Sequence, residues 1–582
     1  MRKFLAIASA VALVAVAAPG RAEAVQGGQA QTGGSYSLTV RIGDPAKGEP
    51  IWGCSAAWVA VDWALTTADC LRQSGATPAT AGDAPARTMT VNGANVLGVV
   101  LHPDRDVALL RFGRSLVAVN APDRLPLATT PPISGETFKV SGAGRSGTEW
   151  IPRFTNRGDF TAGTVTDTGI ALNPANSAGV CEGDAGGAVV RVLPVGAELV
   201  GLIGTGGQGG CYGEPVGGDR LANAVRVDDL GPWIGSWTLN SGFEARDVAL
   251  TSDPAPTSSG VTGAARTIST EQAHTGTQSL LYQGTDASST TSYAYLAAYP
   301  AANLPVTSGT VLQYWIRPQG GGNATCATVG LDFADGTHVR DLNAYSAISG
   351  PTDSTSLCGQ LVPDAWNEVL TDVGGVAAGK KISRVTVDYN HAAGTGAYRG
   401  FIDDIQIANG CVARPGKACS SPVVPAYPAG TPLADPAPAA AGSTVEDFAY
   451  PDPDGTLAAA HVKLISGNGR IVSADCDTTP TGAYGYLVVR SSDESIGEDG
   501  KICLQALGGV GLLTMEIPDV YSVRSDGRNL GEGHVTTATW RELGSTTTDS
   551  GDVPLGGLLA IGIGSATPGN PPATLLQLIV KQ

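Results

Sequence analysis

Histidine and cysteine, the side chains that most often carry acid–base and thiol chemistry, occur in contrasting patterns in this sequence. The 582 residues include only six histidines, and His102 is the only one between residues 25 and 237. The ten cysteines form neighbouring pairs along the chain: Cys54 and Cys70, Cys181 and Cys211, Cys326 and Cys358, Cys411 and Cys419, Cys476 and Cys503. No C-x-x-C or Cys/His grouping typical of a zinc site is present, so the even count favours five disulfides.

Composition limits the classes of protein that fit. A chain of 582 residues is too long for one hydrophobic core, which indicates about three domains. Seventy-nine glycines, 37 prolines and a charged fraction of 15% favour many short strands over helices. A net charge of −17 without any Lys/Arg cluster excludes nucleic acid as the expected partner.

Residues 1–24 have the pattern of a signal peptide. Arg2 and Lys3 precede the apolar run Phe4–Ala18, and Ala22-Glu23-Ala24 forms an A-x-A cleavage site. A membrane anchor is the alternative, but the apolar run is shorter than the ~20 residues that a spanning helix needs. No later segment is long and apolar enough to span. We therefore expect a secreted, extracellular chain that begins at Val25.

One stretch, C-E-G-D-A-G-G at Cys181–Gly187, and several segments around it share an order and spacing with a known family. Upstream are V-Q-G-G at 25–28, W-A-L-T-T-A-D-C ending at Cys70, and D-V-A-L-L at 106–110. They resemble the I-V-G-G, W-V-L-T-A-A-H-C, D-I-A-L-L and C-x-G-D-S-G-G motifs of chymotrypsin/trypsin-like serine proteases. Cys211 and residues 225–237 resemble the disulfide partner and the closing helix. The resemblance implies a trypsin-like double β-barrel over residues 25–237.

The same resemblance implies that the catalytic triad is broken. It places Ala185 at the serine position, Asp69 at the histidine position and Asp106 at the aspartate position. In this family a histidine oriented by the aspartate activates the serine hydroxyl, and an alanine methyl cannot attack a carbonyl. His102 precedes Asp106 by four residues, or ~13 Å along a strand, so it is not expected to replace the missing base. The sequence predicts a catalytically inactive domain.

Other positions of the domain keep the residues that the family needs for its shape. The resemblance assigns the N–H groups of Gly183 and Ala185 to an oxyanion hole and pairs Asp184 with the free N-terminus of Val25. Gly179 stands at the primary-specificity position, so the pocket lacks an acidic base. Two alternatives stay open. The preserved loop can be inherited architecture without a present role, and Asp69 with Asp106 can form an acid–base or divalent-cation pair instead of an eroded triad.

Residues 238–410 form a second all-β segment by pattern, with strands expected at 311–317, 328–333 and 382–387. The segments 240–244, 274–280 and 401–405 resemble jelly-roll carbohydrate-binding modules. This resemblance implies a structural calcium held by Glu244 and by Asp403 or Asp404, although these acids can equally face solvent. Sugar rings stack on flat aromatic faces, and the candidate platforms are Tyr314, Trp315, Trp366 and Tyr389.

The remainder divides into a linker and a third domain. Residues 411–443 are rich in proline and alanine and are expected to be an extended spacer. Residues 444–582 show about eight strand signals separated by turns, which favours a second β-sandwich. Asp452-Pro453-Asp454-Gly455 indicates a turn. We find no catalytic pattern in this part, so the fold class is an all-β multidomain chain.

These observations predict a secreted pseudoprotease that acts by binding. Its ligand would be a peptide or protein, assisted by a glycan-binding-like module that holds polysaccharide, and the protease-like domain would need no cofactor. The alternative is a residual serine-type endopeptidase with an unconventional site. A purely structural envelope protein is a third interpretation.

Overall fold

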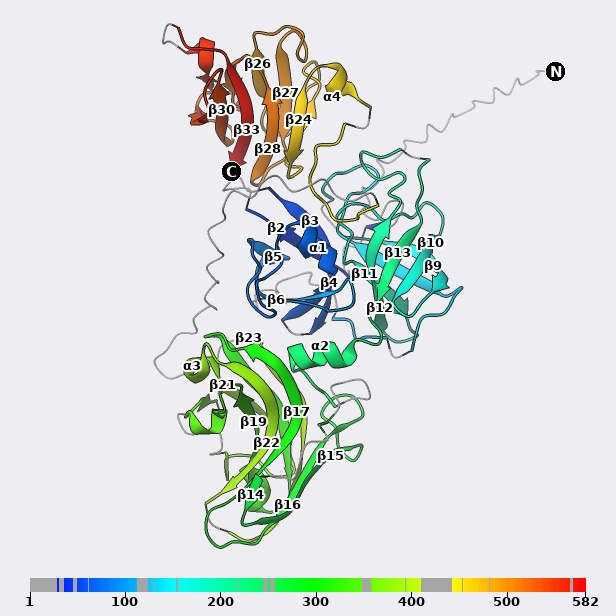
Figure 1. The fold of residues 1–582 in the computed structure, drawn as a ribbon, viewed down its shortest axis with the longest axis vertical. Coiled ribbons are helices and arrows are strands. Elements are labelled where there is room, and N and C mark those ends of the chain that lie inside the picture. Colours follow the sequence, from blue (N-terminus) through cyan, green and yellow to red (C-terminus); the bar gives the residue numbers. More distant parts are fainter. Residues whose placement is uncertain are drawn as a thin grey trace, which may run out of the picture.

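Three β-rich units follow one another along the chain (Figure 1). The computed structural model describes residues 29–30, 36–44, 50–60, 62–112, 124–128, 130–152, 155–215, 217–243, 250–251, 257–347, 357–392, 394–409, 442–452, 454–480, 482–565 and 569–581. The strand pairings within these residues are antiparallel, apart from a single parallel bridge between Leu127 and Leu199. The all-β multidomain prediction is confirmed.

The first unit begins with a closed six-stranded barrel in the order β2-β3-β4-β7-β6-β5. Along β2 the side chains alternate between buried and half-buried, which is the period of two that a barrel wall requires. A short helix, α1 (Ala68–Gln73), follows β4 directly. The strands are β2 (Leu38–Ile42), β3 (Trp52–Ala60), β4 (Trp63–Thr66), β5 (Met89–Val91), β6 (Ala94–Leu101) and β7 (Ala108–Phe112).

The second barrel of this unit also closes, because β8 pairs with both β9 and β11. β1 (Gln29–Ala30) adds to its outside along β9, and α2 (Gly231–Thr238) ends the unit. The double barrel predicted for this region is therefore confirmed. Its strands are β8 (Thr137–Gly142), β9 (Asn156–Val165), β10 (Gly169–Pro174), β11 (Ala188–Val192), β12 (Ala197–Gly206) and β13 (Ala222–Arg226).

The second unit is a sandwich of two antiparallel sheets, drawn in green in Figure 1. One sheet has the order β14-β17-β22-β19 and the other β15-β16-β23-β18-β21-β20. The three predicted strands lie within β18, β19 and β22. The strands are β14 (Thr257–Ser259), β15 (Val261–Ser269), β16 (Ser279–Asp286), β17 (Ser292–Pro305), β18 (Thr310–Gln319), β19 (Ala327–Phe333), β20 (Tyr345–Ser346), β21 (Asn367–Asp372), β22 (Lys381–His391) and β23 (Gly396–Asn409), with the short helices η3 (Gly322–Cys326), η4 (Val339–Asp341) and α3 (Gly374–Ala377) between them.

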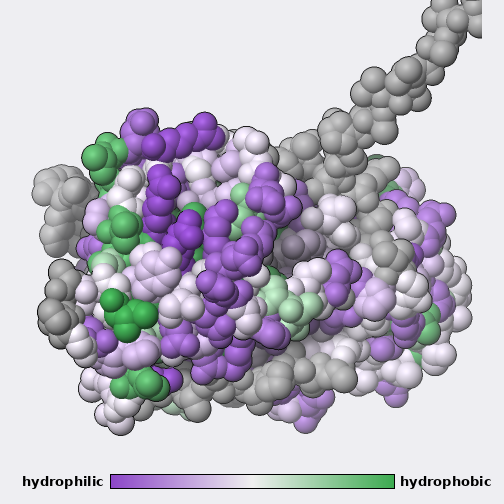
Figure 2. Space-filling model, turned by 90° about the horizontal axis from the view of Figure 1, so that it is seen from above, coloured by the Kyte–Doolittle hydropathy of each residue, from purple (hydrophilic) through white to green (hydrophobic). Residues whose placement is uncertain are grey.

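The third unit is a smaller sandwich with five strands in each sheet, in the orders β24-β28-β33-β30-β31 and β25-β27-β26-β29-β32. The predicted second sandwich is confirmed. Seen from this end in Figure 2, hydrophobic patches are separate and surrounded by hydrophilic side chains. Its elements are α4 (Thr456–Ala459), β24 (Lys463–Gly467), β25 (Ile471–Ala474), β26 (Leu487–Ser491), β27 (Lys501–Ala506), β28 (Gly511–Ile517), β29 (Val520–Arg524), β30 (Val535–Glu542), β31 (Asp549–Val553), β32 (Leu558–Ala560), η5 (Gly562–Gly564) and β33 (Ala573–Lys581).

Four of the five predicted disulfides are present: Cys54–Cys70, Cys181–Cys211, Cys326–Cys358 and Cys476–Cys503. The proposed Cys411–Cys419 pair lies outside the described residues, as do the signal peptide and residues 411–441 of the linker. Among the helices of the described part, none is long and apolar enough to cross a membrane.

Candidate functional site

The loop from Cys181 to Gly187 is held in one shape by glycine backbones and by the first barrel. Gly183 has a φ of +91° and Gly186 a φ of +82°, a region that disfavours residues with a Cβ. A Cβ on Gly186 would lie 2.3 Å from the carbonyl oxygen of Ser55. The hydroxyl of Ser55 donates to the carbonyl of Gly183 (2.8 Å), and its N–H donates to the carbonyl of Ala185 (2.8 Å). The disulfide Cys181–Cys211 closes the loop.

Asp184 lies fully buried behind this loop. Its carboxylate accepts hydrogen bonds from the N–H of Gly144 (2.9 Å) and from the N–H of Cys181 (2.8 Å). Burial raises the pKa of Asp184 to about 7, although these two bonds oppose the shift. Val25 lies outside the described residues, so the predicted ion pair between Asp184 and the N-terminus stays a prediction.

The three positions of the expected triad hold Ala185, Asp69 and Asp106. Asp106 lies just before β7, which begins at Ala108. Its Oδ1 accepts a hydrogen bond from the backbone N–H of Asp69 at 2.7 Å. Asp69, in the first turn of α1, turns its carboxylate to Arg72, with 3.0 Å between Oδ1 and Nη1. Ala185 is buried and packs in the core of the first barrel. The site contains an oriented carboxylate, but no hydroxyl at residue 185 and no imidazole at residue 69.

The two carboxylates influence each other but do not form a convincing cation site. Burial raises the pKa of Asp106 to about 6, and the negative charge of Asp69 adds to the shift. Arg72 Nη1 also lies 3.5 Å from Asp106 Oδ1, so a guanidinium already neutralises the space between the two acids. A divalent ion needs further oxygen ligands and would be repelled by that guanidinium. The arrangement fits an eroded triad better than a metal site.

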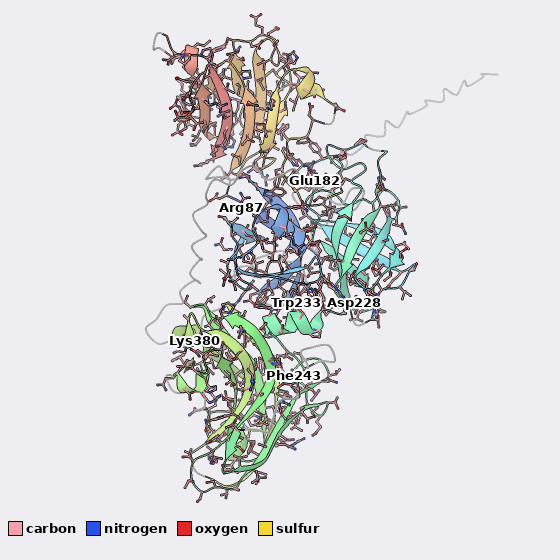
Figure 3. All side chains as sticks on the ribbon, viewed as in Figure 1. Arg87, Glu182, Asp228, Trp233, Phe243 and Lys380 are labelled. Atoms are coloured by element: carbon pink, nitrogen blue, oxygen red, sulfur yellow. A yellow bond between two sulfur atoms is a disulfide. The ribbon has the colours of Figure 1, made fainter. Side chains whose placement is uncertain are left out.

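His102 has a separate environment. Its ring packs edge-on against Trp233 of α2, with 4.8 Å between ring centroids, and its Nδ1 accepts the N–H of Asp104 at 3.1 Å. Trp233 is labelled in Figure 3 at the end of the barrels that faces the second unit. Burial and the nearby Arg105 lower the pKa of His102. Both ring contacts are structural, which agrees with the expectation that His102 does not replace a catalytic base.

The N–H groups of Gly183 and Ala185 converge on one acceptor, and that acceptor is a peptide carbonyl from this chain. The carbonyl oxygen of Thr444 lies 2.8 Å from the N of Gly183 and 3.0 Å from the N of Ala185. Two convergent backbone donors stabilise negative charge on a carbonyl oxygen. The two N–H groups that the resemblance assigns to an oxyanion hole therefore share one acceptor, the Thr444 carbonyl, and the catalytic role of this site remains a prediction.

Comparisons with known proteins give one family match within the chain. Residues 25–234 match the trypsin family model. They form a trypsin-like serine protease domain. Among solved structures, neuropsin, described as a serine protease expressed in the limbic system of mouse brain, is 16% identical; the alignment covers 36% of this chain and 98% of neuropsin, with a TM-score of 0.28. No curated protein sequence matches the chain.

The trypsin-like domain pairs with residues 442–446 along the groove between its two barrels. On one side, the N–H of Gly206 donates to the carbonyl of Gly442 (3.0 Å), and Thr205 bridges Ser443 in antiparallel register. On the other side, Gly53 and Glu446 exchange two backbone hydrogen bonds of 2.9 Å each. The peptide thus lies extended across both barrels, with the Thr444 carbonyl in the middle.

The side chain of Thr444 packs against the second barrel. Its hydroxyl donates to the carbonyl of Gly204 (2.6 Å), and the residue is fully buried. A Cβ on Gly206 would lie 3.6 Å from the Thr444 methyl and 2.1 Å from Cγ2 of Val180, the residue after the buried Gly179. The specificity role predicted for Gly179 remains a prediction, but Thr444 lies in the region where that pocket was expected.

A buried charge cluster fixes Glu446. The Nε and Nη2 atoms of Arg145 each lie 2.7 Å from a carboxylate oxygen of Glu446, in a bidentate pair. Arg145 also pairs with Glu182, which Figure 3 labels at the end of the domain that faces the third unit. The Glu446 carboxylate raises the pKa of Arg145 above its usual value, although burial opposes the shift. No sequence pattern indicated a role for Arg145 or for residues 442–446, because their roles depend on contacts between distant segments.

In the second unit, Asp403 and Asp404 hold a turn. Asp403 Oδ2 accepts the N–H of His274 (2.7 Å) and Asp404 Oδ2 contacts Nδ1 of the same histidine (2.7 Å). Thr275 donates its hydroxyl to Asp404 Oδ1 (2.6 Å) and its N–H to Asp403 Oδ2 (3.2 Å). Burial raises the pKa of Asp403 to about 6. Glu244 lies outside the described residues, so the calcium site remains a prediction, but protein donors already use the described carboxylates.

The candidate sugar platforms separate into two groups. Tyr314 and Tyr389 are buried; Tyr314 shares a hydrogen bond with Thr328 and Tyr389 stacks on Tyr398, so both are core residues. Trp315 and Trp366 are partly exposed and flank His274, at ring-centroid distances of 4.0 and 5.6 Å. These two tryptophans remain candidates for stacking on a sugar.

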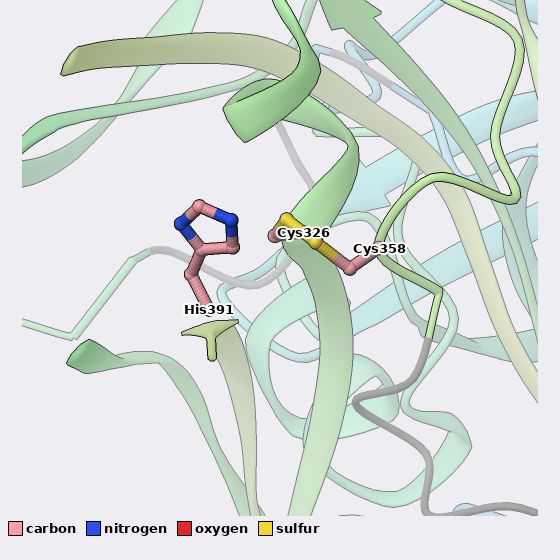
Figure 4. A group of neighbouring side chains, drawn as sticks. All are labelled: Cys326, Cys358 and His391. Atoms are coloured by element: carbon pink, nitrogen blue, oxygen red, sulfur yellow. A yellow bond between two sulfur atoms is a disulfide. The ribbon is translucent and has the colours of Figure 1, made fainter. Parts of the chain in front are cut away.

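Two other clusters in the described residues have ligand-type side chains. His391 faces the Cys326–Cys358 disulfide (Figure 4), but the two sulfurs are bonded to each other and offer no thiolate. Asp475, Asp477 and Glu498 lie close together on the surface, which is common for solvated acids. Neither cluster provides a metal site.

The shape of the loop can be tested at Gly186, with Gly196 as a matched control. Both have φ near +82°, but a Cβ on Gly196 meets no atom within 4 Å. We expect Gly196→Ala to destabilise the protein by about 1–2 kcal/mol through left-handed strain alone. Gly186→Ala should lose about 4 kcal/mol or more, because the added methyl also overlaps the backbone of Ser55. Thermal unfolding measures the difference, and equal losses would contradict the proposed tight packing of the loop.

The role of Asp404 is tested by melting Asp404→Asn with calcium and with EDTA. We expect a decrease in Tm of a few degrees in both conditions, because the carboxylate contributes hydrogen bonds of about 1.5–3 kcal/mol to the turn at His274 and Thr275. A decrease that appears only with calcium would instead place the ion on this residue.

Proposed function

We propose that the trypsin-like domain is a catalytically inactive, secreted pseudoprotease that binds an extended peptide in its substrate groove. The observation that supports this proposal best is the carbonyl of Thr444 between the N–H groups of Gly183 and Ala185. Such a groove pairs with a peptide backbone and holds one carbonyl between two N–H donors. It therefore keeps the ability to bind a peptide in the position of a substrate.

The nucleophile and the general base that the reaction needs are both missing. Ala185 offers a methyl group where the nucleophile is expected, and Asp69 offers a carboxylate bound to Arg72 where the general base is expected. A residual hydrolase would need a nucleophile near the Thr444 carbonyl. The buried hydroxyl of Ser55, which contacts this loop, donates to the carbonyl of Gly183 and accepts from the N–H of Ala143 (2.8 Å), so it is occupied structurally.

The second unit supports an accessory role. Trp315 and Trp366 present partly exposed rings beside His274, the arrangement by which aromatic faces contact the apolar faces of sugars. We propose that this surface binds polysaccharide weakly while the trypsin-like domain binds peptide.

The inactive state is tested with the mature chain, casein, peptide esters and a fluorophosphonate probe. We expect no turnover and no labelling, because the domain has no activated hydroxyl at residue 185. The matched variant is Ala185→Ser with Asp69→His, which restores a serine and a base beside Asp106. We expect this variant to cut a peptide bond. Turnover by the unmodified chain that disappears in Asp69→Ala or Asp106→Ala would show a residual hydrolase and overturn the proposal.

A further inference from the structure

The peptide in the groove is a segment of this chain with its own fixed position. We define the docking segment as residues 442–448, which follow the proline-rich linker and precede the third unit. In Figure 1 the yellow stretch before α4 extends from the third unit toward the two barrels. Thr444 is fully buried, Val445 is 1% exposed and Glu446 is 3% exposed. Such complete burial distinguishes the docking segment from a surface linker.

Ser443, Val445 and Glu446 of the docking segment each contact the trypsin-like domain through their side chains. Ser443 donates its hydroxyl to Gln73 of α1 (3.0 Å), and its carbonyl accepts from Gln208 (2.6 Å). Val445 packs in the core of the first barrel together with Ala185. Glu446 forms the buried pair with Arg145. The groove therefore selects side chains as well as backbone.

The docking segment continues into an apolar contact between the first and third units. Phe448 packs with Ile51 and Trp150 of the trypsin-like domain and with Leu512 of β28. Tyr450 meets Trp150 edge-on at 5.3 Å between ring centroids. A Cβ on Gly469 of the third unit would lie 2.6 Å from the Ile151 side chain, so the two surfaces approach closely here.

Resting on the proposed function, we infer that the ligand of the groove is residues 442–448 of the same chain, bound as a substrate is bound, and that this contact docks the third unit onto the trypsin-like domain. The Thr444–Val445 peptide bond occupies the reaction centre. An external peptide must displace the docking segment before it can bind.

The bond assignment makes a direct prediction for the restored variant. In Ala185→Ser with Asp69→His, the serine hydroxyl would attack the Thr444 carbonyl carbon, its proton would pass to the imidazole, and the Thr444–Val445 bond would break with the proton delivered to the Val445 nitrogen. Water then releases the Thr444 carboxylate. We expect a new N-terminus at Val445, formed at a rate independent of protein concentration, and no labelling of the uncut chain by the fluorophosphonate probe. Rapid labelling of the uncut chain would show an open groove and overturn the inference.

Docking is tested in the full chain after a site-specific protease sequence is placed within residues 425–435 and cut. We expect the two pieces to elute together from a sizing column. Val445→Asp should separate them, because the new carboxylate would be buried in an apolar core without a partner. Val510→Asp is the matched control, since Val510 is 39% exposed in the third unit. Glu446→Lys is a second opening variant, because it puts a like charge beside Arg145.

The strength of docking should fall as pH rises. In the docked state burial raises the pKa of Glu182 to about 8, and Glu446, Asp447 and Glu214 add to the shift while Arg145 opposes it. Asp184, also raised, is the other acid that faces Glu446. Undocking removes Glu446 and Asp447, so the pKa of Glu182 falls and docking takes up a proton. The contribution is complete at low pH and is lost as pH rises through about 8.

We expect less co-elution of the cut pieces at about pH 9 than at about pH 6, and Glu182→Gln should flatten the change.

A labelled peptide, Gly-Ser-Thr-Val-Glu-Asp-Phe, distinguishes the inference from the proposed function. We expect it to bind the Val445→Asp chain at least about tenfold more tightly than the unmodified chain, whose groove is filled. Equal binding to both, with cut pieces that separate, would overturn the inference and leave a peptide-binding pseudoprotease. Binding to neither, or co-elution unaffected by Val445→Asp, would place the contact outside the groove and also overturn it. A separate result would contradict the proposed function, namely turnover by the unmodified chain.

Discussion

The two hydrogen bonds from Gly183 and Ala185 to the Thr444 carbonyl depend on most of the surrounding structure. The N–H groups of Gly183 and Ala185, two residues apart, converge on one oxygen in a loop whose left-handed backbone conformation Gly183 permits. The disulfide to Cys211 and the buried Asp184 keep that turn in place. The barrels in turn supply the edges, at Gly53 and Gly206, that align the peptide. The trypsin-like fold therefore holds this one carbonyl in a precise position.

Buried charge gives this contact its specificity. Arg145 and Glu446 are almost fully buried, and removing either one would leave an uncompensated ion in a medium of low dielectric. The pair is bidentate, and Glu446 also accepts a hydrogen bond from the N–H of Phe448 at 2.8 Å. These hydrogen bonds replace the water that burial removes from the two charged groups. Glu182 belongs to the same cluster because it pairs with Arg145, and burial raises its pKa to about 8. An extended peptide without an acid at this position would leave Arg145 without its principal partner.

The sequence predicted the elements of this site that are local and missed those that are not. Motifs near Cys70, Asp106 and Cys181 were sufficient for the double barrel, because their order and spacing resemble those of trypsin-like serine proteases. The positions of Ala185 and Asp69 followed from the same motifs. Residues 442–448 span the predicted boundary between the linker (411–443) and the third domain (444–582), and their docking was not predicted, since backbone pairing to a distant strand leaves no periodic pattern. Arg145 carried no signal, because a buried ion pair between residues 301 positions apart is a property of the fold.

Loss of the nucleophile and occupation of the groove are physically consistent with each other. A peptide held with its carbonyl on two donors is in the geometry from which an active serine protease cuts, so an intact triad would sever the contact that joins the units. Without Ser and His, the same pose becomes a stable junction. The segment is also tethered, which gives it an effective concentration on the order of millimolar, so modest intrinsic affinity keeps the groove filled. A free competitor must exceed that concentration or bind more tightly, and the groove therefore discriminates against weak external peptides without any change in its walls.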